Sequence, residues 1–236
     1  MSREDRAREL PRRRFVALLY GAVSMAAIAP VSAPVARADD KVDAAPVGLT
    51  AGQLAELQEA ASEALPKLVL HDEPRPAPQS TFLDGEGAEI GIAAFQGEVV
   101  VLNMWATWCP PCIHEMPSLD NLAEAMDGTG VRVVCVSADR AVERVTRFYA
   151  DTRNDAHPTI DHLGVYIDSS RRFMLEAVAP GLPVTLIIDR QGREIARLVG
   201  DAAWDTPEVI ALMKRIAQLT AANKREAQAA VAKAPS

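Results

Sequence analysis

Two cysteines separated by two prolines form the part of this sequence that most directly predicts chemistry. Cys109 and Cys112 follow a continuous apolar run over residues 99–104, which suits a strand buried on both faces. Pro110 and Pro111 favour a helix start directly after the first cysteine, because a first-turn proline loses no intrahelical hydrogen bond. The C-x-x-C pair is therefore expected at the junction between a buried strand and a helix N-terminus.

This expected position suits thiol and disulfide chemistry. A thiolate, not a thiol, attacks disulfides, and the partial positive charge at a helix N-terminus stabilises the thiolate of the first cysteine. We therefore predict that Cys109 is the nucleophile. Cys112, about one turn into the helix, is close enough to form the intramolecular disulfide that releases a partner from a mixed disulfide.

The two prolines bear on the direction of electron flow. Neither Pro110 nor Pro111 has a backbone N–H, so two potential donors to the Cys109 sulfur are missing. A less stabilised thiolate disfavours the reduced form, which shifts a dithiol pair towards a reductant. The helix dipole acts in the opposite direction, so a disulfide oxidase that uses the same two cysteines is an alternative.

Other uses of a C-x-x-C pair fit the sequence less well. A zinc site needs two more Cys or His ligands at similar spacing. Haem attachment needs His after the second cysteine, where Ile113 stands, and the usual peroxidase motif would need Pro at Leu102 and Thr or Ser at Ala106. We predict no metal and no cofactor, and a copper chaperone holding Cu(I) on the same thiolates is the non-enzymatic alternative. The four histidines are interpreted as surface or loop residues: His71, His114, His157 and His162.

The apolar pattern elsewhere predicts alternating strands and helices. A small hairpin is expected over residues 82–90, and the helix after the cysteines keeps its apolar period to Met126. A strand, a helix, a short strand and a second helix are then expected near residues 131–137, 142–149, 165–167 and 171–178. Two antiparallel strands and a final helix follow over residues 184–188, 194–199 and 206–219. This alternation predicts an α/β fold.

The residues before the hairpin are expected to form an extension. Thr50 and Gln53 match a capping box, and the helical spacing that follows predicts a helix over residues 51–64. Pro66 ends this helix, and prolines at positions 74, 76 and 78 predict an extended linker, because each fixes φ and removes a donor. We divide the chain into a helix with a Pro-rich linker, a globular domain and a flexible tail over residues 39–79, 80–222 and 223–236.

Residues 1–38 follow the order of an export signal, with arginines before an uncharged stretch. The A-x-A pattern at residues 36–38 predicts cleavage after Ala38. Residues 12–15 also fit the R-R-x-F core of a twin-arginine signal, and an ordinary Sec signal is the alternative. The uncharged stretch over residues 15–36 is long enough for an uncleaved membrane anchor. Both interpretations place the rest of the chain outside the cytoplasm.

The charge of the chain argues against a nucleic-acid partner. The net charge is −7, and residues 1–38 hold seven of the 25 basic and three of the 32 acidic residues, so the remaining residues carry −11. Proteins that bind nucleic acids carry basic patches instead. Protein or small-molecule partners are therefore expected.

Three motifs resemble the TlpA, ResA and CcmG family of exported thioredoxin-like proteins, and the TlpA branch is the most similar. They are residues 99–112, 115–117 and 181–189, which read VVVLNMWATWCPPC, EMP and GLPVTLIID, within a match over about residues 74–218. The resemblance implies a thioredoxin fold, in which a central mixed β-sheet is flanked by helices, here with an N-terminal β-hairpin and a helical extension. Val184 departs from the family pattern, which usually has Thr after the proline.

The resemblance also implies roles for residues near the cysteines. Pro183 matches a cis-proline beside the redox pair, and Leu182 would offer its backbone to an extended substrate, although a proline at a strand start is more often trans. Asn103 stands where ordinary thioredoxins carry a buried Asp that exchanges protons with the second cysteine, which Asn cannot do. Glu115 matches a family Glu that takes this role, with a solvated helix Glu as the alternative.

Other side chains near the motif are expected to shape the site. Trp105 and Trp108 flank the pair and are predicted to form an apolar collar on which partners dock, with core packing as the alternative for Trp105. Pro117 should kink its helix, because an interior proline removes a hydrogen bond. Cys135, among valines, is predicted to be an inert buried thiol.

Together these features predict an exported, periplasmic protein-disulfide reductase in which Cys109 attacks, Cys112 resolves and Glu115 handles the proton. The predicted substrate contacts are Trp108, Pro110, Pro111, Leu182 and Pro183. The resemblance implies a membrane thiol transporter of the CcdA or DsbD kind as electron donor, and apocytochrome c or copper-site assembly proteins as substrates. Membrane contact is expected only if the N-terminus remains an anchor.

Overall fold

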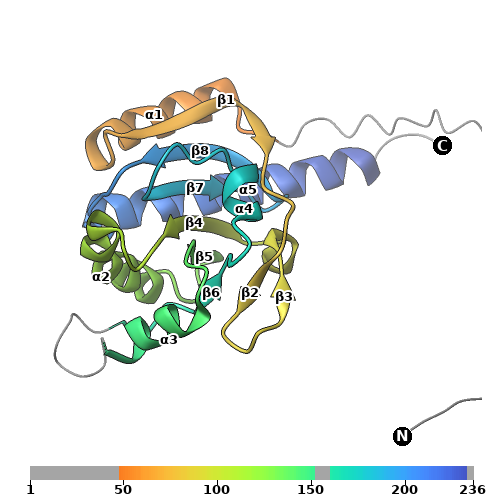
Figure 1. The fold of residues 1–236 in the computed structure, drawn as a ribbon. Coiled ribbons are helices and arrows are strands. Elements are labelled where there is room, and N and C mark those ends of the chain that lie inside the picture. Colours follow the sequence, from red (N-terminus) through yellow and green to blue (C-terminus); the bar gives the residue numbers. More distant parts are fainter. Residues whose placement is uncertain (1–47, 152–159, 233–236) are drawn as a thin grey trace, which may run out of the picture. The chain divides into compact units, whose positions relative to one another are not determined.

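The computed structural model describes residues 48–151 and 160–232, with side chains described up to residue 221. These residues alternate between strands and helices (Figure 1). In chain order, the elements are α1 (Ala51–Ala64), β1 (Leu68–Pro76), β2 (Phe82–Asp84), β3 (Glu89–Ile90), the 3-10 helix η1 (Ile92–Phe95), β4 (Val99–Trp105), α2 (Pro110–Ala125), β5 (Val131–Ser137), α3 (Val142–Asp151), β6 (Tyr166–Ile167), α4 (Arg172–Glu176), β7 (Val184–Ile188), β8 (Arg193–Val199) and α5 (Pro207–Ala232).

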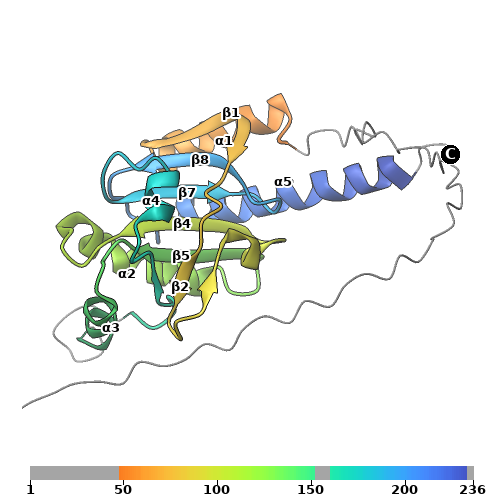
Figure 2. The same cartoon turned by 45° about the vertical axis from the view of Figure 1, so that its right-hand side comes forward.

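The described strands form one mixed sheet in the order β1-β8-β7-β4-β5-β6-β2-β3. β4 pairs in parallel with β5 and antiparallel with β7, and β7 and β8 form the predicted antiparallel pair. Figure 2 shows β1, β8, β7, β4 and β5 one after another across the sheet. This mixed sheet between helices confirms the predicted thioredoxin fold.

Strand β4 is the centre of the fold because every residue in it is buried. Alternate residues of a strand point to opposite faces, so β4 contributes to two separate apolar cores. Val101 and Trp105 pack in the core that includes residues of α1, α2, α3 and α5, whereas Leu102 and Met104 pack in the core that includes Phe173 of α4. Two covered faces explain why its sequence is a continuous apolar run.

The N-terminal extension is part of the same sheet, which corrects one prediction. α1 spans the predicted residues and has the predicted capping box between Thr50 and Gln53. The segment predicted as a Pro-rich linker is instead strand β1, which pairs antiparallel with β8, with a break in register between Leu70 and Arg75. Leu57 of α1 is fully buried in the core, so the fold begins before the predicted boundary at residue 80.

The C-terminal helix is longer than the sequence predicted. α5 continues to Ala232, so most of the predicted tail is helical, in keeping with the helix propensity of its Ala, Lys, Glu and Gln residues. The predicted leader over residues 1–38 and His157 lie outside the described residues. Within residues 48–151 and 160–232, no helix is long and apolar enough to cross a membrane.

Candidate active site

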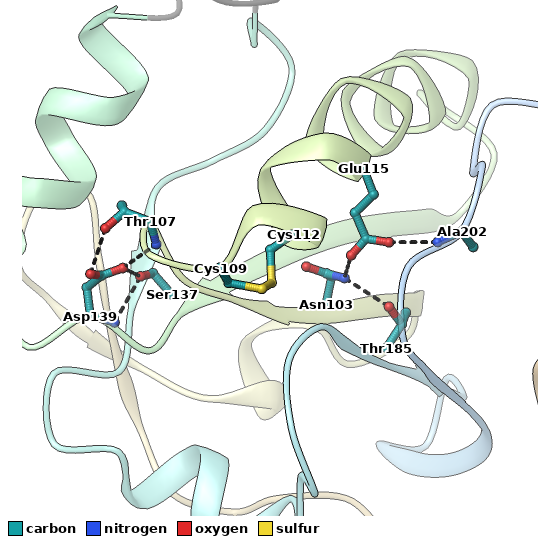
Figure 3. Close-up of a disulfide and its surroundings, with 9 residues drawn as sticks. All are labelled: Asn103, Thr107, Cys109, Cys112, Glu115, Ser137, Asp139, Thr185 and Ala202. Carbon is teal, nitrogen blue, oxygen red and sulfur yellow. Dashed lines mark hydrogen bonds between the residues drawn. A yellow bond between two sulfur atoms is a disulfide. The ribbon is translucent and has the colours of Figure 1, made fainter.

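The two cysteines of the C-x-x-C motif form a disulfide at the N-terminus of α2 (Figure 3). Cys109 is the N-cap residue and Pro110 begins the helix, as predicted, and the Cys109 side chain makes no capping hydrogen bond. The Cα atoms of Cys109 and Cys112 are 5.3 Å apart. Cys109 is 5% exposed and Cys112 is fully buried, so only the first cysteine of the pair has any contact with solvent.

The loop that enters this site is held by a buried carboxylate that the sequence analysis did not identify. Asp139 accepts hydrogen bonds from the backbone N and Oγ1 of Thr107, each at 2.8 Å, and from Ser137 Oγ at 2.8 Å. The sequence did hold a signal for Asp139, because polar residues directly follow the buried run of β5. β4 and β5 are parallel neighbours, so the residues after β5 lie at the same edge of the sheet as those after β4. Asp139 therefore positions the residues directly before Cys109.

Glu115 is 2% exposed, so it is not the solvated helix residue that was the alternative. Its Oε2 accepts from Trp204 Nε1 at 2.9 Å and from Ala202 N at 3.1 Å, and its Oε1 accepts from Asn103 Nδ2 at 2.9 Å. Burial raises the pKa of Glu115 above its ordinary value, and these donors offset only part of that effect. A carboxyl group with a raised pKa is suited to holding and releasing a proton.

Asn103 of β4 connects Glu115 to the other side of the site. Its Nδ2 also donates to Thr185 Oγ1 of β7 at 2.9 Å. Both Asn103 and Thr185 are fully buried. The Oδ1 of Asn103 is buried without a hydrogen-bond partner among the described residues.

An apolar groove lies beside Trp108, the residue that directly precedes Cys109. The peptide bond between Leu182 and Pro183 is cis, as the resemblance implies. Leu182 and Trp108 line a groove whose other walls include Leu175 and Val178. Trp108, Leu175 and Val178 are 55%, 77% and 75% exposed, which is unusual for large apolar side chains.

Trp105 does not belong to this groove, which corrects the predicted collar of two tryptophans. Its side chain is fully buried and its ring lies 5.0 Å from that of Phe148 and 6.1 Å from that of Tyr149. Side chains alternate along β4, and Trp105 points into the core that α2 and α3 cover. Core packing, the alternative interpretation, is therefore correct.

The other residues considered in the sequence belong to the framework of the fold. Pro117 lies inside α2, which continues beyond it. Cys135 is buried as a free thiol, and burial raises its pKa well above the ordinary value, as expected of an unreactive cysteine. His71 is not a surface residue as predicted, because its Nε2 lies 2.8 Å from Oε1 of Glu194 in the buried pairing of β1 with β8. Within the described residues, no group of three or more His, Cys, Asp and Glu side chains could hold a metal ion.

The chain is similar in sequence to known proteins. The Redoxin family profile matches residues 72–216. The chain is 32% identical over 125 residues to the thiol-disulfide oxidoreductase ResA of Bacillus thuringiensis subsp. konkukian, covering 53% of this chain and 68% of that protein. It is 31% identical over 118 residues to the thioredoxin-like protein YneN of Bacillus subtilis, covering 49% of this chain and 65% of that protein.

Solved structures share the fold. A thiol:disulfide interchange protein DsbE from Chlorobium tepidum superposes with a TM-score of 0.51 at 24% identity, covering 60% of this chain and 98% of its own. A secreted thiol-disulfide isomerase from Corynebacterium glutamicum gives a TM-score of 0.52 at 20% identity, covering 66% and 92% of the two chains. The family match, the relatives and the disulfide at the start of α2 lead to one conclusion: the chain belongs to the Redoxin family and is a thiol-disulfide oxidoreductase.

Proposed function

We propose that this oxidoreductase is an exported, periplasmic reductant of protein disulfides. The observation that carries the disulfide chemistry is the difference in exposure between the two cysteines: Cys109 is 5% exposed and Cys112 is fully buried. A disulfide substrate can then react only with Cys109, while Cys112 is held in reserve to resolve the product. The order of an export signal in residues 1–38 supports the location.

The reaction begins with the reduced pair. The Cys109 thiolate attacks one sulfur of the substrate disulfide, a mixed disulfide forms, and the other substrate sulfur leaves as a thiolate that takes a proton. Cys112 then loses its proton and attacks the Cys109 sulfur. The second substrate sulfur leaves and takes a proton, the substrate has gained two electrons, and the protein is left with the Cys109–Cys112 disulfide seen here.

Glu115 is the group that we assign to accept the proton of Cys112. It lies three residues after Cys112 and therefore on the same side of α2. Its carboxyl is buried beside the apolar core that contains Cys112, where no bulk solvent competes for the proton. The raised pKa of Glu115 brings its proton affinity closer to that of a thiol.

Substrates are proposed to dock in the groove beside Cys109. The exposed ring of Trp108 and the apolar groove at Leu182 would contact side chains next to the reacting cysteine. By resemblance, Pro183 would present the backbone of Leu182 to the substrate, and the exposed Pro110 and Pro111 directly follow Cys109 at the start of α2. An extended protein segment fits this arrangement better than a small molecule.

The surroundings of Cys109 support electron transfer from this protein to its substrates. Pro110 and Pro111 offer no N–H to the Cys109 sulfur in either redox state. A weakly stabilised thiolate favours the oxidised protein and hence transfer of electrons to substrates. By resemblance, the electrons come from a membrane thiol transporter of the CcdA or DsbD kind and go to apocytochrome c or to proteins that assemble copper sites.

The reduction potential of the Cys109–Cys112 couple tests this proposal. The purified protein is equilibrated with glutathione or dithiothreitol, and the fraction of reduced protein is measured by thiol labelling. A potential near that of thioredoxin, about −270 mV, is expected of a reductant. A potential near that of DsbA, about −120 mV, would mean that the protein oxidises its substrates. Stoichiometric Cu(I) that is lost in Cys109→Ser would instead favour the copper chaperone.

A further inference from the structure

Asn103 carries an unusual feature for a fully buried amide. Its Nδ2 uses two N–H bonds, one to Glu115 Oε1 and one to Thr185 Oγ1, both at 2.9 Å. Its Oδ1 is equally buried but accepts no hydrogen bond within the described part of the chain. Buried amide oxygens are nearly always satisfied, so this one requires an explanation.

The position of Asn103 indicates where the missing donor belongs. Asn103 lies under α2, because its Nδ2 reaches Glu115, and Cys112 precedes Glu115 by one helical turn on the same side of the helix. Figure 3 shows Oδ1 on the side of the amide that faces the Cys109–Cys112 disulfide, and Nδ2 on the opposite side. The sulfur atoms of a disulfide carry no hydrogen, so neither can donate in this oxidised state.

We propose that Asn103 is a positioning residue whose Oδ1 accepts a hydrogen bond from the Cys112 thiol when the pair is reduced. Reduction by a donor dithiol breaks the S–S bond, transfers two electrons to the two sulfurs, and leaves the donor as a disulfide. The two protons of the donor pass to the cysteine pair, and the one on Cys112 provides the S–H that Oδ1 lacks. Asn103 itself gains and loses no proton.

This hydrogen bond would favour the reduced state. In the oxidised protein the Oδ1 is an unsatisfied buried acceptor, and in the reduced protein it is satisfied. The bonds from Nδ2 to Glu115 and Thr185 can persist in both states, so they cancel in the comparison. Asn103 therefore raises the reduction potential and opposes the effect that we ascribe to Pro110 and Pro111.

Infrared difference spectra between the reduced and oxidised protein test the hydrogen bond directly. The S–H stretching band of Cys112 is expected at a lower frequency than that of an unbonded thiol. The band is identified by comparing the reduced wild-type protein with Cys112→Ser, which keeps the Cys109 thiol. The thiol of Cys135 does not change with redox state and cancels from the difference. A Cys112 band at the frequency of an unbonded thiol would overturn the proposal without the need for any substitution at Asn103.

Substitution of Asn103 tests the energetic consequence. Asn103→Leu keeps the approximate size of the side chain and removes the acceptor. We expect its equilibrium with dithiothreitol to shift towards the disulfide by roughly 5–10-fold, which is about 20–30 mV for a two-electron couple. Thr185→Val is the matched control, since it removes one partner of Nδ2 and leaves Oδ1 in place. A shift below about twofold in Asn103→Leu, or an equal shift in Thr185→Val, would contradict the proposal.

The inference rests on the reversible disulfide chemistry of the proposed function, but the two fail in different ways. If the wild-type protein has the potential of an oxidase, the reductase proposal fails, whereas the shifted S–H band and the effect of Asn103→Leu would still be expected. If the protein reduces substrates as proposed but its Cys112 band is unshifted, only the inference about Asn103 fails.

Discussion

Trp204 should stabilise the fold most strongly when Glu115 is ionised. The indole is fully buried, and its Nε1 donates to Glu115 Oε2 at 2.9 Å. Trp204→Phe keeps an aromatic ring and removes the donor. A hydrogen bond to a charged group contributes about 1.5–3 kcal/mol to stability, against about 0.5–1.5 kcal/mol for one between neutral groups.

The pH dependence follows from the raised pKa of Glu115. Burial raises this pKa above the ordinary value of 4.5, so the contribution of Glu115 to folding is most favourable below pH 4.5 and is lost as the pH rises through the folded-state pKa. Trp204→Phe removes a donor to the ionised form and raises the pKa further. The cost of the substitution should therefore be larger at neutral pH than under acid conditions, by about 1 kcal/mol or more.

Urea unfolding of the oxidised protein, measured at about pH 4 and about pH 7, gives this difference. Trp105→Phe is the matched control, because Trp105 is also fully buried but its Nε1 has no hydrogen-bond partner among the described residues. Its cost should be the same at both pH values. An equal cost of Trp204→Phe at the two pH values would refute the reasoning about Glu115.

Three further outcomes follow from buried groups. Asp139→Ala should lower the free energy of unfolding by about 2–4 kcal/mol, because it leaves the donors of Thr107 unpaired; a loss below about 1 kcal/mol in urea unfolding would contradict this. Leu57→Ala should cost about 2–5 kcal/mol if α1 belongs to the core, and a near-neutral result would show that it does not. Burial raises the pKa of Glu194, but hydrogen bonds from Arg197 and His71 lower it more, to below the ordinary 4.5. Stability from Glu194 is thus present above pH 4.5 and lost as the pH falls below it, and acid unfolding of Glu194→Gln should be less steep there than in the wild type.

The sequence predicted the elements that depend on local pattern. The apolar run of β4, the helix start at Pro110 and the antiparallel pair β7 and β8 were all expected, because each is encoded by neighbouring residues. The cysteine pair was predictable for the same reason. The reactivity of Cys109 depends mainly on its position at the N-terminus of a helix.

The parts that were missed depend on residues distant in sequence. β1 resembled a linker because its prolines disfavour a strand, and only pairing with β8 overrides them. His71 is buried in the pairing of β1 with β8, where its ring contacts the side chain of Glu194. No local pattern connects Trp204 with Glu115, since the loop before α5 brings them together only in the folded chain.

The prolines of β1 have a consequence for how the protein meets other chains. β1 and β3 are the two outer strands of the sheet. A free strand edge can recruit a strand of another molecule, but Pro74 and Pro76 offer no N–H for such pairing, and β3 is only two residues long. The register break in β1 disturbs the edge further. Both outer strands of the described sheet are thus poor templates for aggregation, which would suit the proposed docking of extended protein segments.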